Sequence, residues 1–223
     1  MARLNRIVAA VVWLGLVGCI PAFGQFVSIA YPIPAYTGST TVIPITVTDG
    51  TSVPSLTDGT QTITFSTALH AATVPTSWQT WGSPPYTESS TPRVLTDFGA
   101  TSLTLTLSVP AHTLGFEIES DAFAIVPFTA NFYSGGTLLG TVSITVNGHA
   151  GALLAGGSDR ATITSVVVTT TAAAGGFAMA QLRYGSVSLV GTPAPSSIFT
   201  GGLGMLLLAA GALLARARRS AEA

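Results

Sequence analysis

Three aromatic side chains in a segment rich in glycine and proline are the residues best suited to hold a ligand. Trp78, Trp81 and Tyr86 lie within nine positions of one another. Aromatic rings held on a loop form a flat surface on which sugar rings stack, and neighbouring polar side chains would add hydrogen bonds. Tryptophan also buries readily, and in that case the two tryptophans would pin a long loop to the edge of the fold. The sequence leaves both interpretations open, and these three residues are the candidate ligand-binding residues.

Three carboxylates alternate along a second segment, at Glu117, Glu119 and Asp121. Every second side chain of a strand points to the same face, so the three acids share one face and Phe116 and Ile118 share the other. Carboxylate oxygens are the ligands that Ca²⁺ prefers, but Ca²⁺ takes six or more oxygens and the sequence shows no second acidic cluster. We therefore predict a solvated acidic face without a metal or cofactor, and the three acids are the only candidate metal ligands.

The remaining residue types exclude several functions. His70, His112 and His149 are isolated from one another, and no metal-binding histidine pair, serine-hydrolase motif or phosphate-binding glycine loop is present. The sequence therefore predicts no enzyme. The chain has no lysine, and its formal net charge is -1, so nucleic acid is a poor partner. Its single cysteine, Cys19, lies near the N-terminus, so no internal disulfide is possible.

Short β-strands must position these residues, because the apolar pattern has a period of two almost throughout. Residues 102–108 alternate leucine with threonine or serine, as expected of a strand with one buried face. Turn residues follow at 134–136 and 147–148. Many short strands indicate an all-β fold, a two-sheet antiparallel sandwich resembling a jelly roll. Further strands are expected at residues 41–48, 61–67, 114–119, 124–133, 137–146, 162–170 and 177–184.

The N-terminus has the pattern of a signal peptide. Arg3 and Arg6 precede an apolar stretch at residues 7–18, which is too short to span a bilayer comfortably. Small residues at its end favour cleavage that removes residues 1–24. Alternatively, the residues before Cys19 match a bacterial lipobox, and the protein would then be a lipoprotein anchored through that cysteine. Both interpretations predict export.

The C-terminus has the pattern of a membrane anchor. Residues 198–215 form an uncharged run, which at about 1.5 Å per helical residue spans about 27 Å, enough for a hydrocarbon core. Arg216, Arg218 and Arg219 follow the run within a basic tail at residues 216–223. Basic residues remain on the cytoplasmic side, so this pattern places the rest of the chain outside.

Pro193, Ala194 and Pro195 precede the anchor, in a linker at residues 186–197. This order of proline motif, helix, basic cluster and chain end resembles a PEP-CTERM sorting signal, whose Pro-Glu-Pro motif has a glutamate where this chain has Ala194. The resemblance implies recognition by an exosortase, a membrane transpeptidase, and display of the β-sandwich at residues 25–185 on the cell surface.

From this resemblance we expect an exported, envelope-anchored surface protein with a structural or adhesive role in association with extracellular polysaccharide. The expected partners are an exosortase-type sorting enzyme, the membrane around the C-terminal helix, and polysaccharide. The alternative is a carbohydrate-binding, lectin-like module with a specific glycan site at the aromatic segment. The two hypotheses differ in whether one defined glycan is selected.

Overall fold

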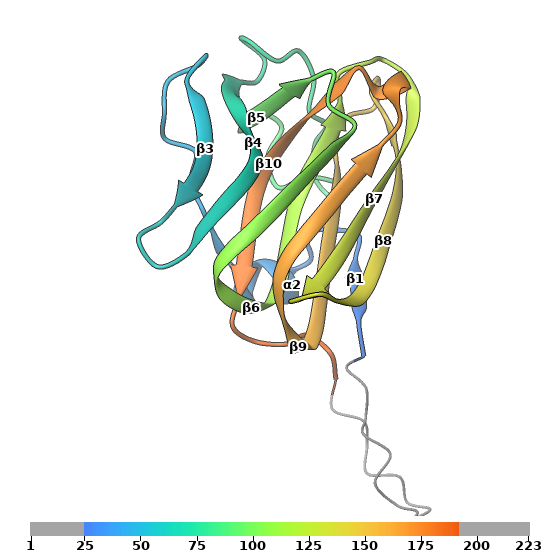
Figure 1. Cartoon of the computed structure of the whole chain (residues 1–223). Helices are drawn as coiled ribbons and strands as arrows, with labels where there is room; N and C mark the ends of the chain where they lie inside the picture. Colours follow the sequence, from blue (N-terminus) through green and yellow to red (C-terminus); the bar gives the residue numbers. More distant parts are fainter. Residues whose placement is uncertain (1–24, 192–223) are drawn as a thin grey trace, which may run out of the picture. The chain divides into compact units, whose positions relative to one another are not determined.

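The computed structural model describes residues 25–191, in which ten β-strands, one short α-helix and one 3₁₀ turn are found (Figure 1). The signal peptide, sorting motif, membrane run and basic tail predicted from the sequence lie outside these residues. None of the helices found in residues 25–191 has the length and apolar character needed to span a bilayer. The elements in chain order are β1 (Val27–Ile29), α2 (Pro34–Ser39), β2 (Thr41–Val42), β3 (Ser52–Thr57), β4 (Thr62–Thr73), β5 (Arg93–Phe98), β6 (Ser102–Ser120), β7 (Ile125–Ser134), β8 (Thr137–Asn147), β9 (Leu153–Thr170), η1 (Ala172–Ala174) and β10 (Gly176–Gly185).

The strands form two layers that share three long strands. One layer has the order β3-β4-β6-β9-β7-β8, and the other has the order β4-β5-β10-β6-β9-β1, with β2 beside β10. In each of β4, β6 and β9, one part of the strand pairs within the first layer and another part pairs within the second layer. Strand β6, for example, pairs with β4 through Leu105–Leu107 and with β10 from Thr113 onward. All pairings between these strands are antiparallel, so the predicted all-β antiparallel, sandwich-like architecture is confirmed, while the jelly-roll connectivity stays a prediction.

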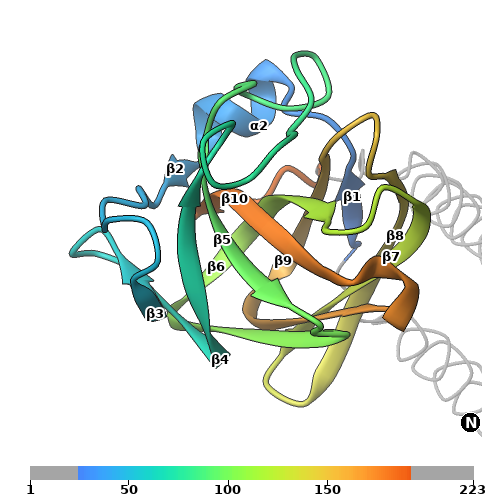
Figure 2. The ribbon, with the colours of Figure 1, turned by 90° about the horizontal axis from the view of Figure 1, so that it is seen from above.

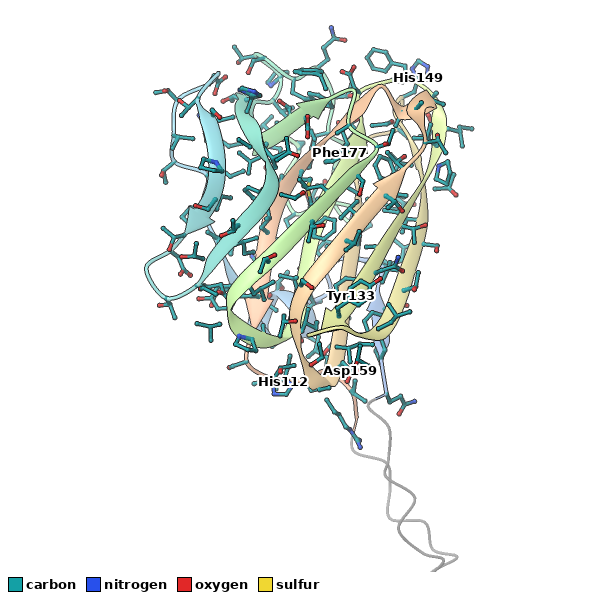
Figure 3. All side chains as sticks on the ribbon, viewed as in Figure 1. His112, Tyr133, His149, Asp159 and Phe177 are labelled. Carbon is teal, nitrogen blue, oxygen red and sulfur yellow. The ribbon has the colours of Figure 1, made fainter. Side chains whose placement is uncertain are left out.

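The long strands pass from one layer to the other at one end of the domain. The pairing of β6 with β9 shifts register on both sides of Ala111, as expected where a strand bends between sheets. Figure 1 shows β6 and β9 bending at this end, and Figure 3 labels His112 and Asp159 there. The sequence had predicted separate strands at residues 102–108 and 114–119, but the structure joins them into β6.

Other departures from the predicted strands have local causes. Strand β9 begins at Leu153 rather than at residue 162, because glycines weaken the strand signal of its first half. The expected 41–48 strand pairs with β10 only as far as Ile43, whose N–H donates to the Leu182 carbonyl, since Pro44 has no N–H to donate to a ladder. Strands β3 and β5 were not predicted, because a proline interrupts β3 and β5 contains two charged residues, Arg93 and Asp97.

The main core lies between the layers. Phe116 and Ile118 of β6 point into it and are fully buried, as their alternation with the glutamates predicts. The opposite face of the same layer carries a second buried cluster, formed by Ala72, Val74, Trp78, Trp81, Val94, Ala152, Ala178 and Ala180. Three of its members belong to residues 74–92, the long connection between β4 and β5, which we call the cap segment. Figure 2 shows this segment and α2 side by side, over the end of the sheet that holds β10 and β5.

The packed domain extends beyond its predicted end. Residues 186–190 were expected to be part of a linker, but Val190 is buried and the Leu189 N–H donates to Ser158 Oγ at 2.8 Å. Val27 of β1 also pairs with Ser158. The first and last described residues therefore lie at the same end of the domain, and the linker prediction is wrong for residues 186–190, because it rested on composition alone.

Candidate functional site

Two tryptophans anchor the cap segment to buried glutamates of β6. Trp81 is 1% exposed, and its indole Nε1–H donates to Glu117 Oε2 at 2.8 Å. Trp78 is 6% exposed, and its Nε1–H donates to Glu119 Oε2 at 2.7 Å. Each indole N–H thus satisfies one buried carboxylate oxygen.

The second oxygen of each glutamate also has a donor from the cap segment. Glu117 Oε1 accepts the backbone N–H of Glu88 at 2.6 Å, and Glu119 Oε1 accepts the hydroxyl of Thr80 at 2.7 Å. Alanines of β10 lie directly opposite the two glutamates in the strand register. These small side chains leave room above the sheet for the indole rings, so the local sequence of β10 permits the packing.

The predicted roles of these residues need correction. The prediction of an exposed platform formed by Trp78 and Trp81 is wrong, because both rings are buried. The alternative prediction, that the two tryptophans pin a long loop to the fold, describes their packing. A solvated acidic face is wrong for Glu117 and Glu119, which are fully buried beneath the cap segment. Asp121 is exposed and lies beyond the end of β6. Within residues 25–191 no group of three acidic, histidine or cysteine side chains is placed to hold a metal ion.

Burial changes the acid–base properties of the two glutamates. Loss of water raises the pKa of Glu117 to about 7, against the opposing effect of the hydrogen bonds from Trp81 and from the Glu88 backbone. The pKa of Glu119 is raised to about 7 for the same reason, against the hydrogen bonds from Trp78 and Thr80. Both side chains therefore titrate near neutral pH while holding the cap segment in place.

The third aromatic residue, Tyr86, lies at an open groove. Its ring is 52% exposed and lies 5.8 Å, centroid to centroid, from the ring of Tyr31, which is 48% exposed. Tyr31 lines a groove of about 540 Å³, which we call the tyrosine groove, and Tyr86 lies beside this groove, between the lining residues Pro85 and Thr87. The groove is lined by Tyr31, Pro32, Ile33, Pro34, Thr37, Pro84, Pro85, Thr87 and Glu88.

One arginine ties the two sides of the tyrosine groove together. Arg183 of β10 donates from Nε and Nη2 to the two carboxylate oxygens of Glu88, both at 2.7 Å. Its Nη1 donates to the carbonyl of Thr40, just after α2, at 3.0 Å. Both side chains of the ion pair are mostly buried, at 14% and 15% exposed. A bidentate ion pair of this kind fixes the position of both walls.

Sequence reasoning missed Tyr31 and Arg183 as parts of this site. Tyr31 is far from Tyr86 in the chain, so their positions in the sequence give no sign that the two rings meet. The groove forms because α2 and the cap segment cover the same face of one layer. The only available signal was the Tyr-Pro-Ile-Pro run at residues 31–34, whose prolines resemble Pro84 and Pro85 opposite.

Comparisons with known proteins identify no family for the chain. No protein-family model matches it. No curated protein matches it either. Among solved structures, the chain is similar to a family two carbohydrate esterase from Cellvibrio japonicus, with 12% sequence identity and a TM-score of 0.29. The match covers 77% of this chain and 36% of that one, so the chain spans little more than a third of the esterase's length.

The buried glutamates predict a stability that falls as pH rises. In the unfolded chain their pKa is close to 4.5, and in the folded chain it is about 7. Between these values the folded state binds more protons than the unfolded state, so stability decreases up to about pH 7 and then levels off. We expect the melting temperature of the full chain to fall by about 10 °C or more from pH 5 to pH 8.

The control is the double variant Glu117→Gln and Glu119→Gln, which keeps an acceptor for each indole but cannot titrate. Its melting temperature should be nearly constant over the same range. A wild-type protein whose melting temperature does not change, or rises, between pH 5 and pH 8 would contradict the assignment.

Proposed function

We propose that this chain is an exported, envelope-anchored surface protein that adheres to extracellular polysaccharide through the tyrosine groove. The observation that carries the proposal is the pair of half-exposed rings, Tyr31 and Tyr86, in contact above a groove lined by four prolines. Exposed aromatic rings beside a preformed apolar groove provide stacking surfaces for the C–H faces of sugar rings.

The rigidity of the groove supports binding to a flexible chain. Its walls are joined by the Arg183–Glu88 ion pair, and the backbone N–H of Glu88 is bonded to buried Glu117. A wall that is already ordered loses little conformational entropy when a ligand binds. Residues 25–191 contain eight acidic and three basic side chains, so an uncharged or amine-bearing polysaccharide suits this domain better than an acidic one.

Binding rather than catalysis is proposed for the two titrating glutamates. A pKa of about 7 suits acid–base chemistry. However, Glu117 and Glu119 have no exposed surface, and each carboxylate is already engaged by a tryptophan N–H. Their role in the proposal is to hold the cap segment that forms one wall of the groove.

Export and anchoring are proposed from the sequence at the two chain ends. The supporting features are the signal-peptide pattern of residues 1–24 and the resemblance of residues 193–219 to a PEP-CTERM sorting signal, which an exosortase-type enzyme would recognise. The alternative anchor is a lipid on Cys19. A lectin-like module that selects one glycan is the alternative function, and it would use the same groove with a narrower specificity.

Removing the exposed rings should weaken polysaccharide binding without unfolding the domain. We expect Tyr31→Ala and Tyr86→Ala each to lower affinity about tenfold, since one aromatic contact contributes about 1 kcal/mol or more. The measurement is affinity electrophoresis of the full chain in gels containing hydroxyethylcellulose, xylan, galactomannan or β-1,3-glucan.

Leu138→Ala provides the matched control, because Leu138 is 51% exposed on β8 and does not line the groove. The proposal predicts unchanged retardation for this variant. Wild-type protein that no gel retards would contradict adhesion to neutral polysaccharide. Retardation by one polysaccharide alone would support the lectin-like alternative.

Truncation before Pro193 should release the domain from the envelope, because the proposed anchor is then absent. We expect the truncated protein in the soluble fraction and the full chain with membranes, as measured by immunoblotting after fractionation. A second variant, Cys19→Ala, should leave the full chain in the membrane fraction. If the truncated protein remains with membranes and Cys19→Ala releases the full chain, the lipid anchor is correct and the C-terminal anchor is wrong.

A further inference from the structure

A second cleft lies at the end of the domain opposite the described chain ends. It encloses about 210 Å³, and we call it the end pocket; it is lined by Ser77, Trp78, Gln79, Thr80, Phe98, Ser120, Asp121 and Phe123. Phe123 stacks on His149, with 5.1 Å between ring centroids. Figure 3 places His149 at the end opposite His112 and Asp159, near which the described chain begins and ends.

Aromatic rings form the walls of the end pocket. Phe98 is 63% exposed and Phe123 is 49% exposed, an unusual degree of exposure for phenylalanine in a domain with a large core. The ring of Phe98 lies 6.1 Å, centroid to centroid, from the ring of Trp78. Aromatic rings are electron-rich on their faces, so a pocket with such walls attracts a positively charged group.

The polar lining has the complementary charge. Asp121 is exposed and is the one charged residue among those that line the pocket. No ion pair to it is found within residues 25–191. The lining also presents Gln79, Ser77 and Thr80, which carry amide and hydroxyl groups. The pocket therefore combines a carboxylate without a counter-ion, aromatic walls and several hydrogen-bonding groups.

We propose that the end pocket binds the ammonium group of an amino-sugar unit, and so makes the domain selective for polysaccharides that carry free amines. This inference deepens the proposed function and rests on it for the class of ligand. The carboxylate of Asp121 pairs with the ammonium, and the faces of Phe98 and Phe123 contribute cation–π attraction. The polar side chains beside them match the ring hydroxyls of a sugar.

The composition of the pocket favours an amino sugar over a lysine side chain of a protein partner. A lysine would bring four methylene groups next to the exposed amide of Gln79 and would give that amide no partner. The hydroxyls of Ser77 and Thr80 already donate to Asp49 and Glu119, so toward a ligand they act only as acceptors. A sugar ring carries hydroxyl groups beside its amine, and these pair with the amide of Gln79. Because unpaired polar groups weaken binding, the lining selects the sugar.

The end pocket and the tyrosine groove are built from one segment. Residues 77–80 line the pocket and residues 84, 85, 87 and 88 line the groove, on either side of Trp81 in the sequence. Trp81 and Trp78 fix this segment to the sheet through Glu117 and Glu119. Two contacts on a rigid segment would bind one polysaccharide with a higher apparent affinity than either site alone.

The test compares two oligosaccharides of the same length and linkage whose amines are either free or acetylated. The β-1,4-linked glucosamine hexamer and its fully N-acetylated counterpart are titrated into the full chain in detergent at pH 6, by calorimetry. We expect the glucosamine hexamer to bind at least tenfold more tightly. Asp121→Asn should abolish that preference: the affinity for the glucosamine hexamer should fall at least tenfold, and the affinity for the acetylated hexamer should not change.

Asp97→Asn is the matched control, because it removes the same charge from β5 at a position that does not line the pocket. The proposal predicts wild-type binding for this variant. Equal losses in Asp121→Asn and Asp97→Asn would show attraction to overall charge and would overturn the site. Equal binding of the two hexamers, or an Nα-acetyl-lysine methylamide that binds as tightly as the glucosamine hexamer, would also overturn the proposal.

Methyl glucosaminide separates this proposal from the groove. A single sugar unit should bind wild type and Tyr86→Ala equally, and should lose its affinity in Asp121→Asn. If the tyrosine variants retain full polysaccharide binding, the groove is not the polysaccharide site. The methyl glucosaminide result still shows whether the end pocket binds the amine. If methyl glucosaminide binds wild type and Asp121→Asn equally, the end pocket is wrong whatever the tyrosine variants show.

Discussion

Two buried hydrogen bonds, from Trp81 to Glu117 and from Trp78 to Glu119, hold the cap segment on the sheet. A carboxyl group that loses its water without gaining a partner costs several kcal/mol, so the glutamates require these donors. The tryptophans in turn need a partner for each N–H, because their rings are buried. Each tryptophan therefore needs its glutamate and each glutamate needs its tryptophan. The two hydrogen bonds fix the distance of the cap segment from the sheet and its position along β6.

The two clefts depend on this anchoring. The cap segment has no strand or helix of its own, so its shape is set by the groups that attach it. Near Trp81 it forms a wall of the tyrosine groove, and around Trp78 it forms a wall of the end pocket. Arg183 adds a second attachment by joining Glu88 to the segment after α2. The binding surfaces are therefore preorganised by interactions that the ligand never touches.

The raised pKa values follow from the same packing. The carboxyl groups are buried so that the cap segment can cover the sheet, and burial favours their neutral form. A protonated carboxyl still accepts a hydrogen bond from an indole, so the anchor survives at acid pH. At higher pH the buried carboxylates are charged, and only the hydrogen-bond donors around them offset the loss of water. For this reason the domain is most stable on the acid side of neutrality.

Much of the fold could be predicted from alternation, but the site could not. A period of two correctly placed Phe116 and Ile118 in the core and the glutamates on the other face. The pattern of a single strand does not show what packs on its second face, so the face with Glu117 and Glu119 was interpreted as solvated. The groove was missed for the same reason. Tyr31 and Tyr86 meet between irregular segments that cover the sheet, and these segments have no periodic pattern of apolar residues.

The predicted ends of the domain show the same limit. Composition marked residues 186–190 as a linker, yet Leu189 is bonded to Ser158 of β9. The sequence divides β6 into two strands around Pro110, where β6 bends between layers, and it predicts only the second half of β9. Local signals thus located the bend of β6 and missed the continuity that the neighbouring strands impose.

The most direct test of the anchoring is hydrogen–deuterium exchange of the indole N–H groups, measured by NMR on the full chain labelled with ¹⁵N-tryptophan. The reference for an exposed indole is N-acetyl-tryptophanamide in the same buffer. The account predicts that the Trp78 and Trp81 indole N–H groups exchange at least a hundredfold more slowly than that of the reference compound. It also predicts that Glu117→Gln shifts the Trp81 signal and that Glu119→Gln shifts the Trp78 signal. Indole protons at 78 and 81 that exchange as fast as that of the reference compound would contradict the account.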